Sequence, residues 1–238
     1  MTKANNRGDG PRIKICGLTD PAQAANCAAL GADAIGLIFH PPSPRYVTLD
    51  QAAAIADAFP PTVPAVGVFV NVGWEQLAAT VRYCRLGAVQ LHGNEPQSLV
   101  ARLQDSFDGV VIKALFAAKK PRLTDVDRYR ASAYLVECGR GVQPGGNALT
   151  WEWGAAADLA RRHPTLLAGG LDADNVARAI ADALPDAVDV SSGVEAAPGR
   201  KDPAKVARFI AAVRQTGPLY AQGGRVVREV FGPWRAQV

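Results

Sequence analysis

Several residue types and patterns are scarce in this chain, and each scarcity excludes a class of protein. The four cysteines, Cys16, Cys27, Cys84 and Cys138, lie far apart, without a Cys-x-x-Cys pair or a nearby pair of histidines. Disulfides and structural zinc are therefore not expected. No apolar run reaches the roughly 18 residues of a membrane span, and the polar start Met1–Gly10 has no secretory core. We therefore expect a cytoplasmic protein that does not associate with membranes.

Strong charge of one sign is also missing. The net charge is +4, spread along the chain, and no basic run is interleaved with aromatic residues. Such a pattern argues against nucleic acid as a partner and suits a small anionic ligand. The apolar fraction of 48% and the charged fraction of 20% are those of an ordinary globular protein.

The chain does contain a regular alternation of two kinds of segment. Short apolar runs predict strands at 12–16, 34–39, 65–70, 88–91, 109–115, 133–137, 165–168 and 187–190. Alanine-rich segments of helical period predict helices at 21–30, 49–58, 75–83, 96–104, 152–162, 174–183 and 203–215, with a weaker one near 125–130. This strict alternation leaves no room for hairpins and predicts a parallel sheet with crossover helices.

Eight strand–helix units predict a single-domain (β/α)₈ TIM barrel over residues 12–215. A doubly wound open sheet is the alternative, but its dinucleotide-binding form would place a GxGxxG turn where Cys16-Gly17-Leu18-Thr19 stands. Residues 1–11 are expected to form a disordered leader. Residues 216–238 are expected to form a helical extension that packs on the barrel or on another subunit, because Val226, Val227, Val230, Phe231 and Trp234 form an apolar stripe.

Chemistry in such a barrel belongs at the C-terminal ends of the strands. Cys16 ends the first strand, just before a helix that starts at Asp20-Pro21, where the helix dipole can lower a thiol pKa; the alternative is a small buried residue. Glu137 ends the sixth strand, ahead of a glycine-rich loop, and is a general-acid candidate. An ion pair between Glu137 and Lys14 or Lys113 is compatible with that role.

Three further strand-end residues are candidates for substrate binding. Arg45, in the loop after the second strand, can clamp a carboxylate through two parallel hydrogen bonds. His92 follows the fourth strand and could act as a base, although capping or packing is the commoner role. Asp189, in the last strand, could orient substrate hydroxyls or a neighbouring loop.

The turns after the last two strands predict a phosphate site. Gly169, Gly170 and Leu171 follow the seventh strand, and Ser192 and Gly193 follow the eighth. Unhindered backbone N–H groups and hydroxyls at these two places make the usual phosphate site of a TIM barrel. No cluster of metal ligands stands beside them, so we expect no metal.

Together these segments resemble the phosphoribosylanthranilate isomerase family from about Arg12 to Arg214. The resemblance is carried by the motifs KICGLT at 14–19, SPRYV at 43–47, VGVFVN at 66–71, VQLHG at 89–93, LAGGL at 167–171 and DVSSGVE at 189–195, with PGRKD at 198–202. It implies a cofactor-free Amadori rearrangement in tryptophan biosynthesis. It further implies that Cys16 is the general base and that Arg45 meets the anthranilate carboxylate, with phosphate held near Gly170 and Ser192.

The chain departs from the family pattern at the sixth strand. The family has an aspartate that protonates the furanose oxygen, and this chain has Glu137, whose carboxyl lies about one methylene farther out. A misplacement of about 1 Å can cost on the order of 10²-fold in rate. The alternatives are therefore a related barrel acting on another aminosugar phosphate, a non-catalytic barrel that binds a phosphorylated metabolite, and an indole-glycerol-phosphate synthase using Lys113.

Overall fold

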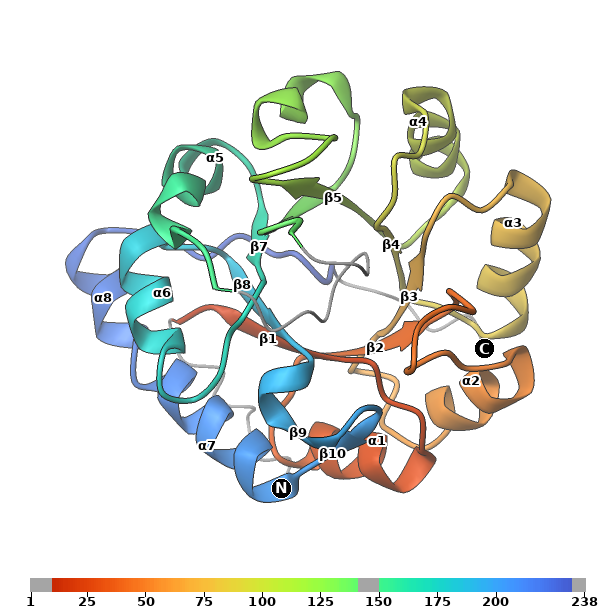
Figure 1. Cartoon of the computed structure of the whole chain (residues 1–238), viewed down its shortest axis with the longest axis horizontal. Coiled ribbons are helices and arrows are strands. Elements are labelled where there is room, and N and C mark those ends of the chain that lie inside the picture. Colours follow the sequence, from red (N-terminus) through yellow and green to blue (C-terminus); the bar gives the residue numbers. More distant parts are fainter. Residues whose placement is uncertain (1–9, 141–149, 233–238) are drawn as a thin grey trace.

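A closed barrel of eight parallel strands forms the centre of the computed structural model, which describes residues 10–140 and 150–232 (Figure 1). The strands are β1 (Arg12–Cys16), β2 (Ala34–Ile38), β3 (Ala65–Phe69), β4 (Ala88–Leu91), β5 (Val110–Phe116), β6 (Ala133–Glu137), β7 (Thr165–Leu167) and β8 (Ala187–Val190). Each strand pairs with the next along the chain, and β8 closes onto β1. The (β/α)₈ fold predicted from the sequence is confirmed.

Helices surround this barrel as an outer ring (Figure 1). The α-helices are α1 (Pro21–Ala29), α2 (Leu49–Ala56), α3 (Trp74–Tyr83), α4 (Gln97–Ser106), α5 (Ala157–Arg162), α6 (Val176–Ala183), α7 (Pro203–Arg214) and α8 (Gly217–Gln222). Two expected helices differ in kind: the weak one is a 3₁₀ helix, η1 (Leu123–Arg128), and another 3₁₀ helix, η2 (Trp153–Ala156), precedes α5.

The barrel strands separate two cores because alternate side chains point to opposite faces of a sheet. On β1, Ile13 and Ile15 belong to the outer core between sheet and helices. Lys14 and Cys16 alternate with them and therefore point into the barrel. The inner core is built from alternate residues of the other strands, including Ala34, Val66, Ala88, Ile112, Leu135, Leu166 and Ala187.

A hairpin follows β8, and here the expected strict alternation is wrong. After the 3₁₀ helix η3 (Ser192–Val194), β9 (Glu195–Ala197) pairs antiparallel with β10 (Arg200–Lys201). Pro198 and Gly199 form the turn, and Gly199 has a φ of 78°. Proline followed by a glycine with positive φ is the signature of a tight turn, which allows this short hairpin.

The C-terminal segment fills the end of the barrel at which the strands start. The expected helix is present only as α8, and residues 223–232 are irregular. Val230 and Phe231, which are 1% and 4% exposed, join the inner core beside residues that begin strands, whereas Val226 is 81% exposed. The expected stripe is thus not a helix face. Trp234, the leader up to residue 9 and residues 141–149 of the loop after β6 lie outside the described residues, while Gly10 and Pro11 are buried.

A buried carboxylate holds this segment in place. Asp186, just before β8, is fully buried, accepts a hydrogen bond from the Thr165 backbone N–H at 2.9 Å and pairs with Arg228 at 2.7 Å and with Arg225 at 3.4 Å. The Tyr220 hydroxyl of α8 donates to the Pro185 carbonyl at 2.5 Å. The segment is therefore an integral part of the barrel.

Replacing the buried carboxylate is expected to destabilise the fold. Asp186→Ala removes the acceptor shared by two guanidinium groups and by the backbone N–H groups of Thr165 and Arg228, and we expect a loss of about 3 kcal/mol in the free energy of unfolding, measured in urea. Asp182→Ala, which removes an exposed pair with Arg178, is the control and is expected to cost less than about 1 kcal/mol. Equal midpoints for the two variants would contradict this account.

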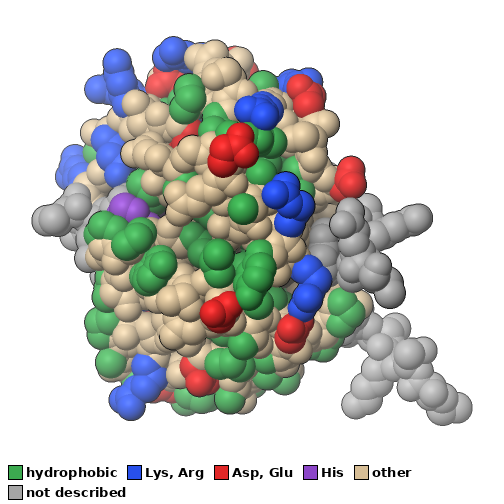
Figure 2. Space-filling view, turned by 90° about the vertical axis from the view of Figure 1, so that its right-hand side faces the viewer, with side chains coloured by type: hydrophobic (Ala, Val, Ile, Leu, Met, Phe, Trp, Pro, Cys, Tyr) green, Lys and Arg blue, Asp and Glu red, His purple; other side chains and the backbone are tan. Residues whose placement is uncertain are grey.

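The surface carries charges of both signs. On the face in Figure 2, acidic and basic side chains are interspersed among hydrophobic ones. None of the helices in the described parts of the chain has both the length and the apolar character needed to span a membrane.

Candidate active site

Cys16 lies at the C-terminal end of β1, inside the barrel, and is 6% exposed. The chain turns sharply after it: Gly17 has a φ of 78°, and the backbone N–H groups of Gly17 and Leu18 both donate to the Gly36 carbonyl. Gly36 of β2 lies directly opposite Cys16 in the ladder. A Cβ at Gly36 would come within 2.7 Å of the Cys16 Sγ and 2.9 Å of its Cα. The space occupied by the thiol therefore depends on this glycine.

The expectation of a lowered thiol pKa is wrong for the structure as it stands. Burial raises the pKa of Cys16 above its ordinary value, and the Asp189 carboxylate adds to this, while the ammonium groups of Lys14 and Lys201 act against it. Lys14 is fully buried below the thiol and donates to Asp189 Oδ1 at 2.8 Å. Burial dominates over the cations, so the resting side chain is the neutral thiol.

Glu137 ends β6, points into the barrel and is 7% exposed. Its Oε1 lies 3.6 Å from the His92 Nε2. Burial by itself raises the pKa of Glu137, but His92, with smaller contributions from Lys119 and Lys14, lowers it below its ordinary value. The resting carboxyl is therefore ionised, next to an imidazole.

His92 is placed by its neighbours on both sides. Its Nδ1 lies 2.9 Å from the Gln90 Nε2, two residues earlier on β4, and its ring stands edge-on to Phe116. The other ring nitrogen, Nε2, faces Glu137. The histidine is 5% exposed and packs against other side chains, so a direct contact with substrate stays a prediction.

The two lysines considered as partners for Glu137 have other partners. Lys14 pairs with Asp189, and Lys113 pairs with Glu95 at 2.8 Å. Lys113 is fully buried and also donates to the carbonyls of Leu91 and Gly93. It is thus a structural residue that fixes the loop after β4 and is not exposed for covalent chemistry.

Arg45 is buried on the other side of Cys16. Its Nε and Nη2 donate to the two carboxylate oxygens of Glu195 at 2.8 and 2.6 Å, and Lys201 donates to the same Glu195 at 2.7 Å. The edge of the guanidinium formed by Nε and Nη2 is therefore occupied. Sequence reasoning identified Arg45 but missed Glu195 and Lys201, although both stand in the motifs that it quoted.

The turns after β7 and β8 are brought together. Gly169 and Gly170 have φ values of 92° and 68°, and a Cβ at Gly193 would lie only 2.0 Å from the Leu171 carbonyl oxygen. The two turns thus touch through a glycine. Leu171 is buried, whereas Ser192, like the glycines, is partly exposed.

Three side chains that sequence reasoning missed hold the turn after β7. Asn175 donates to the Gly170 carbonyl at 2.8 Å. The indole N–H groups of Trp151 and Trp153 donate to the carbonyls of Ala168 and Gly169 at 2.9 and 3.1 Å. These three bonds fix the carbonyls of the turn. The two nearby tryptophans in a chain with few aromatics were the available signal.

A methyl group at position 36 is expected to displace the thiol. In Gly36→Ala the new Cβ meets Sγ and the backbone of Cys16, so we expect kcat to fall by about 10²-fold. The fall should exceed that of Gly73→Ala, where a Cβ meets no atom within 4 Å. Steady-state kinetics of both variants measure this, and equal rates would contradict the assigned position of the thiol.

These features define an α/β barrel with ionisable side chains at the C-terminal ends of its strands, the architecture of an enzyme. The family model for N-(5′-phosphoribosyl)anthranilate isomerase matches residues 13–212. The chain belongs to this family and is an isomerase of tryptophan biosynthesis, as the resemblance predicted.

Individual relatives agree. The N-(5′-phosphoribosyl)anthranilate isomerase of Desulfatibacillum aliphaticivorans is 53% identical over 209 residues, covering 88% of this chain and 95% of the relative. That of Geobacter sulfurreducens is 44% identical over 199 residues, covering 84% and 96%. Among solved structures, the Thermotoga maritima isomerase is 37% identical with a TM-score of 0.79, covering 86% and 99%. Another isomerase structure, 36% identical with a TM-score of 0.76 and the same coverage, holds reduced 1-(o-carboxyphenylamino)-1-deoxyribulose 5-phosphate.

Proposed function

We propose that this isomerase converts N-(5-phosphoribosyl)anthranilate to 1-(2-carboxyphenylamino)-1-deoxyribulose 5-phosphate with Cys16 as general base and Glu137 as general acid. The observation that supports the assignment is that both side chains point into one barrel at the C-terminal ends of their strands. The turns after β7 and β8 lie at the same end and receive the phosphate. The complex of a relative with a reduced product analogue supports a substrate of this size.

The reaction needs two protons donated, to the furanose oxygen and to C1′, and two removed, from C2′ and from the 2′-hydroxyl. Glu137 donates a proton to the furanose oxygen, the bond between that oxygen and C1′ breaks, and the nitrogen lone pair forms the Schiff base. The Cys16 thiolate then takes the proton from C2′, and the electron pair moves toward nitrogen to give an enolamine. The Cys16 thiol then returns its proton to C1′ while the 2′-hydroxyl gives its proton to the Glu137 carboxylate, which forms the ketone and restores the thiolate and the carboxylic acid. Arg45 meets the anthranilate carboxylate through its two Nη groups, because Glu195 occupies the edge formed by Nε and Nη2.

The two assigned groups predict a broad, flat pH profile. The pKa of Glu137 is lowered from 4.5 and that of Cys16 is raised from 9.0. The reactive form, carboxylic acid with thiolate, holds as many protons as the resting form, carboxylate with thiol. Its fraction is therefore constant between the two pKa values. We expect kcat/KM to fall only below the lower pKa, where the thiolate is lost, and above the higher one, where the acid is lost. A sharp optimum near neutrality would contradict the pair.

The proposal includes the localisation and the oligomeric state of the enzyme. We place the enzyme in the cytoplasm, since its cysteines are free within the described residues. We also propose a homodimer, because a Thermotoga maritima relative is described as dimeric. Sedimentation velocity at several concentrations tests the dimer, and a monomer at all of them would refute it.

Turnover of freshly made phosphoribosylanthranilate, followed by its loss of fluorescence, tests the function directly. We expect turnover without added metal or cofactor. Tight binding of the reduced product analogue without turnover would instead favour a barrel used for another phosphorylated metabolite.

A further inference from the structure

Lys201 lies at the junction between the two ends of the proposed site. We infer that Lys201 is a positioning residue that sets the place of both Arg45, at the carboxylate end, and the Ser191–Gly193 turn, at the phosphate end. This inference rests on the proposed function. Lys201 itself does not touch the substrate, but it would couple the affinity for the substrate carboxylate to the affinity for the substrate phosphate.

The ammonium group of Lys201 contacts both Glu195 and Ser191. Lys201 Nζ donates to Glu195 Oε1 at 2.7 Å and to the Ser191 carbonyl at 3.1 Å, and lies 3.4 Å from the Ser191 hydroxyl. Glu195 in turn holds Arg45 through two parallel hydrogen bonds. Ser191 directly precedes Ser192 and Gly193, so a single cation links the arginine and the phosphate turn.

The β9–β10 hairpin places Lys201 next to Glu195. Lys201 pairs with Glu195 in the β9–β10 ladder, and the Gly199 N–H of the hairpin turn donates to Glu195 Oε1 at 3.2 Å. The side chains of Lys201 and Glu195 are only 2% and 5% exposed. Charges that are buried to this extent lose hydration, so their mutual geometry is tightly defined. Burial also lowers the pKa of Lys201 below its ordinary value, in spite of Glu195.

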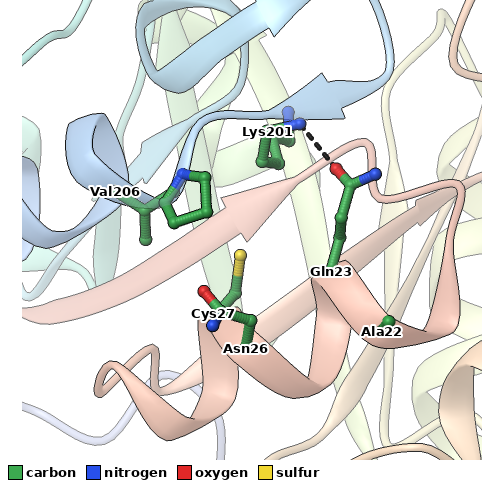
Figure 3. A pocket seen from close by; sticks show the side chains of 7 residues that line it. Ala22, Gln23, Asn26, Cys27, Lys201 and Val206 are labelled. Carbon is green, nitrogen blue, oxygen red and sulfur yellow. Dashed lines mark hydrogen bonds between the residues drawn. The ribbon is translucent and has the colours of Figure 1, made fainter.

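Helix α1 fixes the backbone of Lys201 from outside the barrel. The Lys201 N–H donates to the Gln23 side chain at 2.7 Å, as Figure 3 shows. A pocket of about 220 Å³ lies beside the lysine and is lined by Gln23, Asn26, Cys27 and Val206, among others. Because of this space and the backbone bond, a methionine at position 201 can be accommodated, and Lys201→Met removes the charge without forcing the hairpin apart.

Loss of the ammonium has consequences at both ends. Glu195 keeps Arg45 as a partner but loses the Lys201 ammonium, its second cation. The Arg45–Glu195 pair can therefore shift. The Ser191 carbonyl is left without this donor, and the turn that follows can relax. A purely structural lysine would lower stability and leave the two affinities unchanged.

The test compares Lys201→Met with Arg200→Met, a matched control on the same hairpin with an exposed side chain. Calorimetry measures binding of the reduced product analogue, of the same compound without its carboxylate, and of inorganic phosphate. We expect Lys201→Met to bind all three ligands more weakly than the parent does. The affinity for the analogue that carries the carboxylate should fall most, by about 30-fold. The ratio of its affinity to that of the analogue without the carboxylate should fall at least fivefold. In turnover assays we expect the KM of Lys201→Met to rise by a similar factor, and kcat to fall as well, because the Lys201 ammonium acts against the raised pKa of the Cys16 thiol.

Lys201→Arg retains a buried cation and is expected to restore most of the lost affinity. The inference would be overturned if Lys201→Met and Arg200→Met bound the three ligands with equal affinity, even if their melting temperatures differed. If Lys201→Met does not fold, Lys201→Gln, which keeps a polar end group without the charge, carries the test: weaker affinity for both ends supports coupling, and no change at either end refutes it. Absence of turnover in the parent would refute the proposed function alone, because the binding measurements do not depend on it.

Discussion

Cys16→Ala is expected to reduce kcat by about 10²- to 10⁴-fold, the contribution of a general base. Alanine removes the only atom of this side chain that can accept the C2′ proton, while the backbone turn at Gly17 and its bonds to the Gly36 carbonyl are kept. Affinity for the reduced product analogue should change little, because the thiol is not assigned to either end of the ligand. Fluorescence-based turnover and calorimetry measure the two quantities.

Cys27→Ala is the matched control for this experiment. Cys27 is also buried, at 2% exposed, but lies on α1 in the outer core. We expect it to keep the parent rate. A Cys16→Ala variant that turns over as fast as Cys27→Ala would show that another group removes the proton.

Glu137→Gln is expected to reduce kcat by a comparable factor of about 10²- to 10⁴-fold. The amide has the shape of the carboxyl and can still face His92, but it cannot donate a proton to the furanose oxygen and reload. Glu137→Asp keeps an acid that is one methylene shorter and should be at least tenfold faster than Glu137→Gln. Single-turnover kinetics separates this chemical step from binding.

Glu75→Gln, on the exposed surface of α3, is the control. A Glu137→Gln enzyme with parent activity, together with a Glu137→Asp enzyme that is no faster, would exclude Glu137 as the acid. If instead Glu137→Asp exceeds the parent, glutamate is a slower variant of the family's aspartate.

The fold was predictable because it depends on periodicity. Continuous apolar runs such as Ala65–Phe69, buried at every position, identify strands covered on both faces. The observed ends of these strands differ from the predicted ones by at most one residue. The hairpin at 195–201 was missed because its strands are only three and two residues long, too short to form a pattern.

The site could be predicted as a list of positions but not as a set of pairs. Strand ends identified Cys16, Arg45, His92, Glu137 and Asp189, because a barrel places such ends together. Which cation meets which carboxylate depends on side-chain directions across distant strands, and no spacing in the sequence encodes it. For the same reason the thiol pKa was expected to fall: the local helix start was visible in the sequence, and burial was not.

The C-terminal segment was misread for a different reason. Valines and a phenylalanine at three- and four-residue spacing satisfy the pattern of a helix face. In the structure, only Val230 and Phe231 of these are buried, and Arg225 and Arg228 between them determine the path of the chain by pairing with Asp186. Ion pairs with a distant carboxylate here outweigh the local preference.

The position of Val230 and Phe231 in the inner core has a consequence for how the protein is made. A ribosome synthesises these residues after all eight barrel strands and after helices α1 to α8, so the nascent barrel can close its ladder while the end at which the strands start is still unfilled. We expect these two side chains to be buried late in maturation, after Cys16 and Glu137 have come together at the opposite end of the barrel. Protease digestion of ribosome-bound chains, extended by an unstructured linker short enough to keep residue 231 inside the exit tunnel or long enough to release it, should detect this as a gain in resistance with the long linker, and identical digestion rates would contradict it.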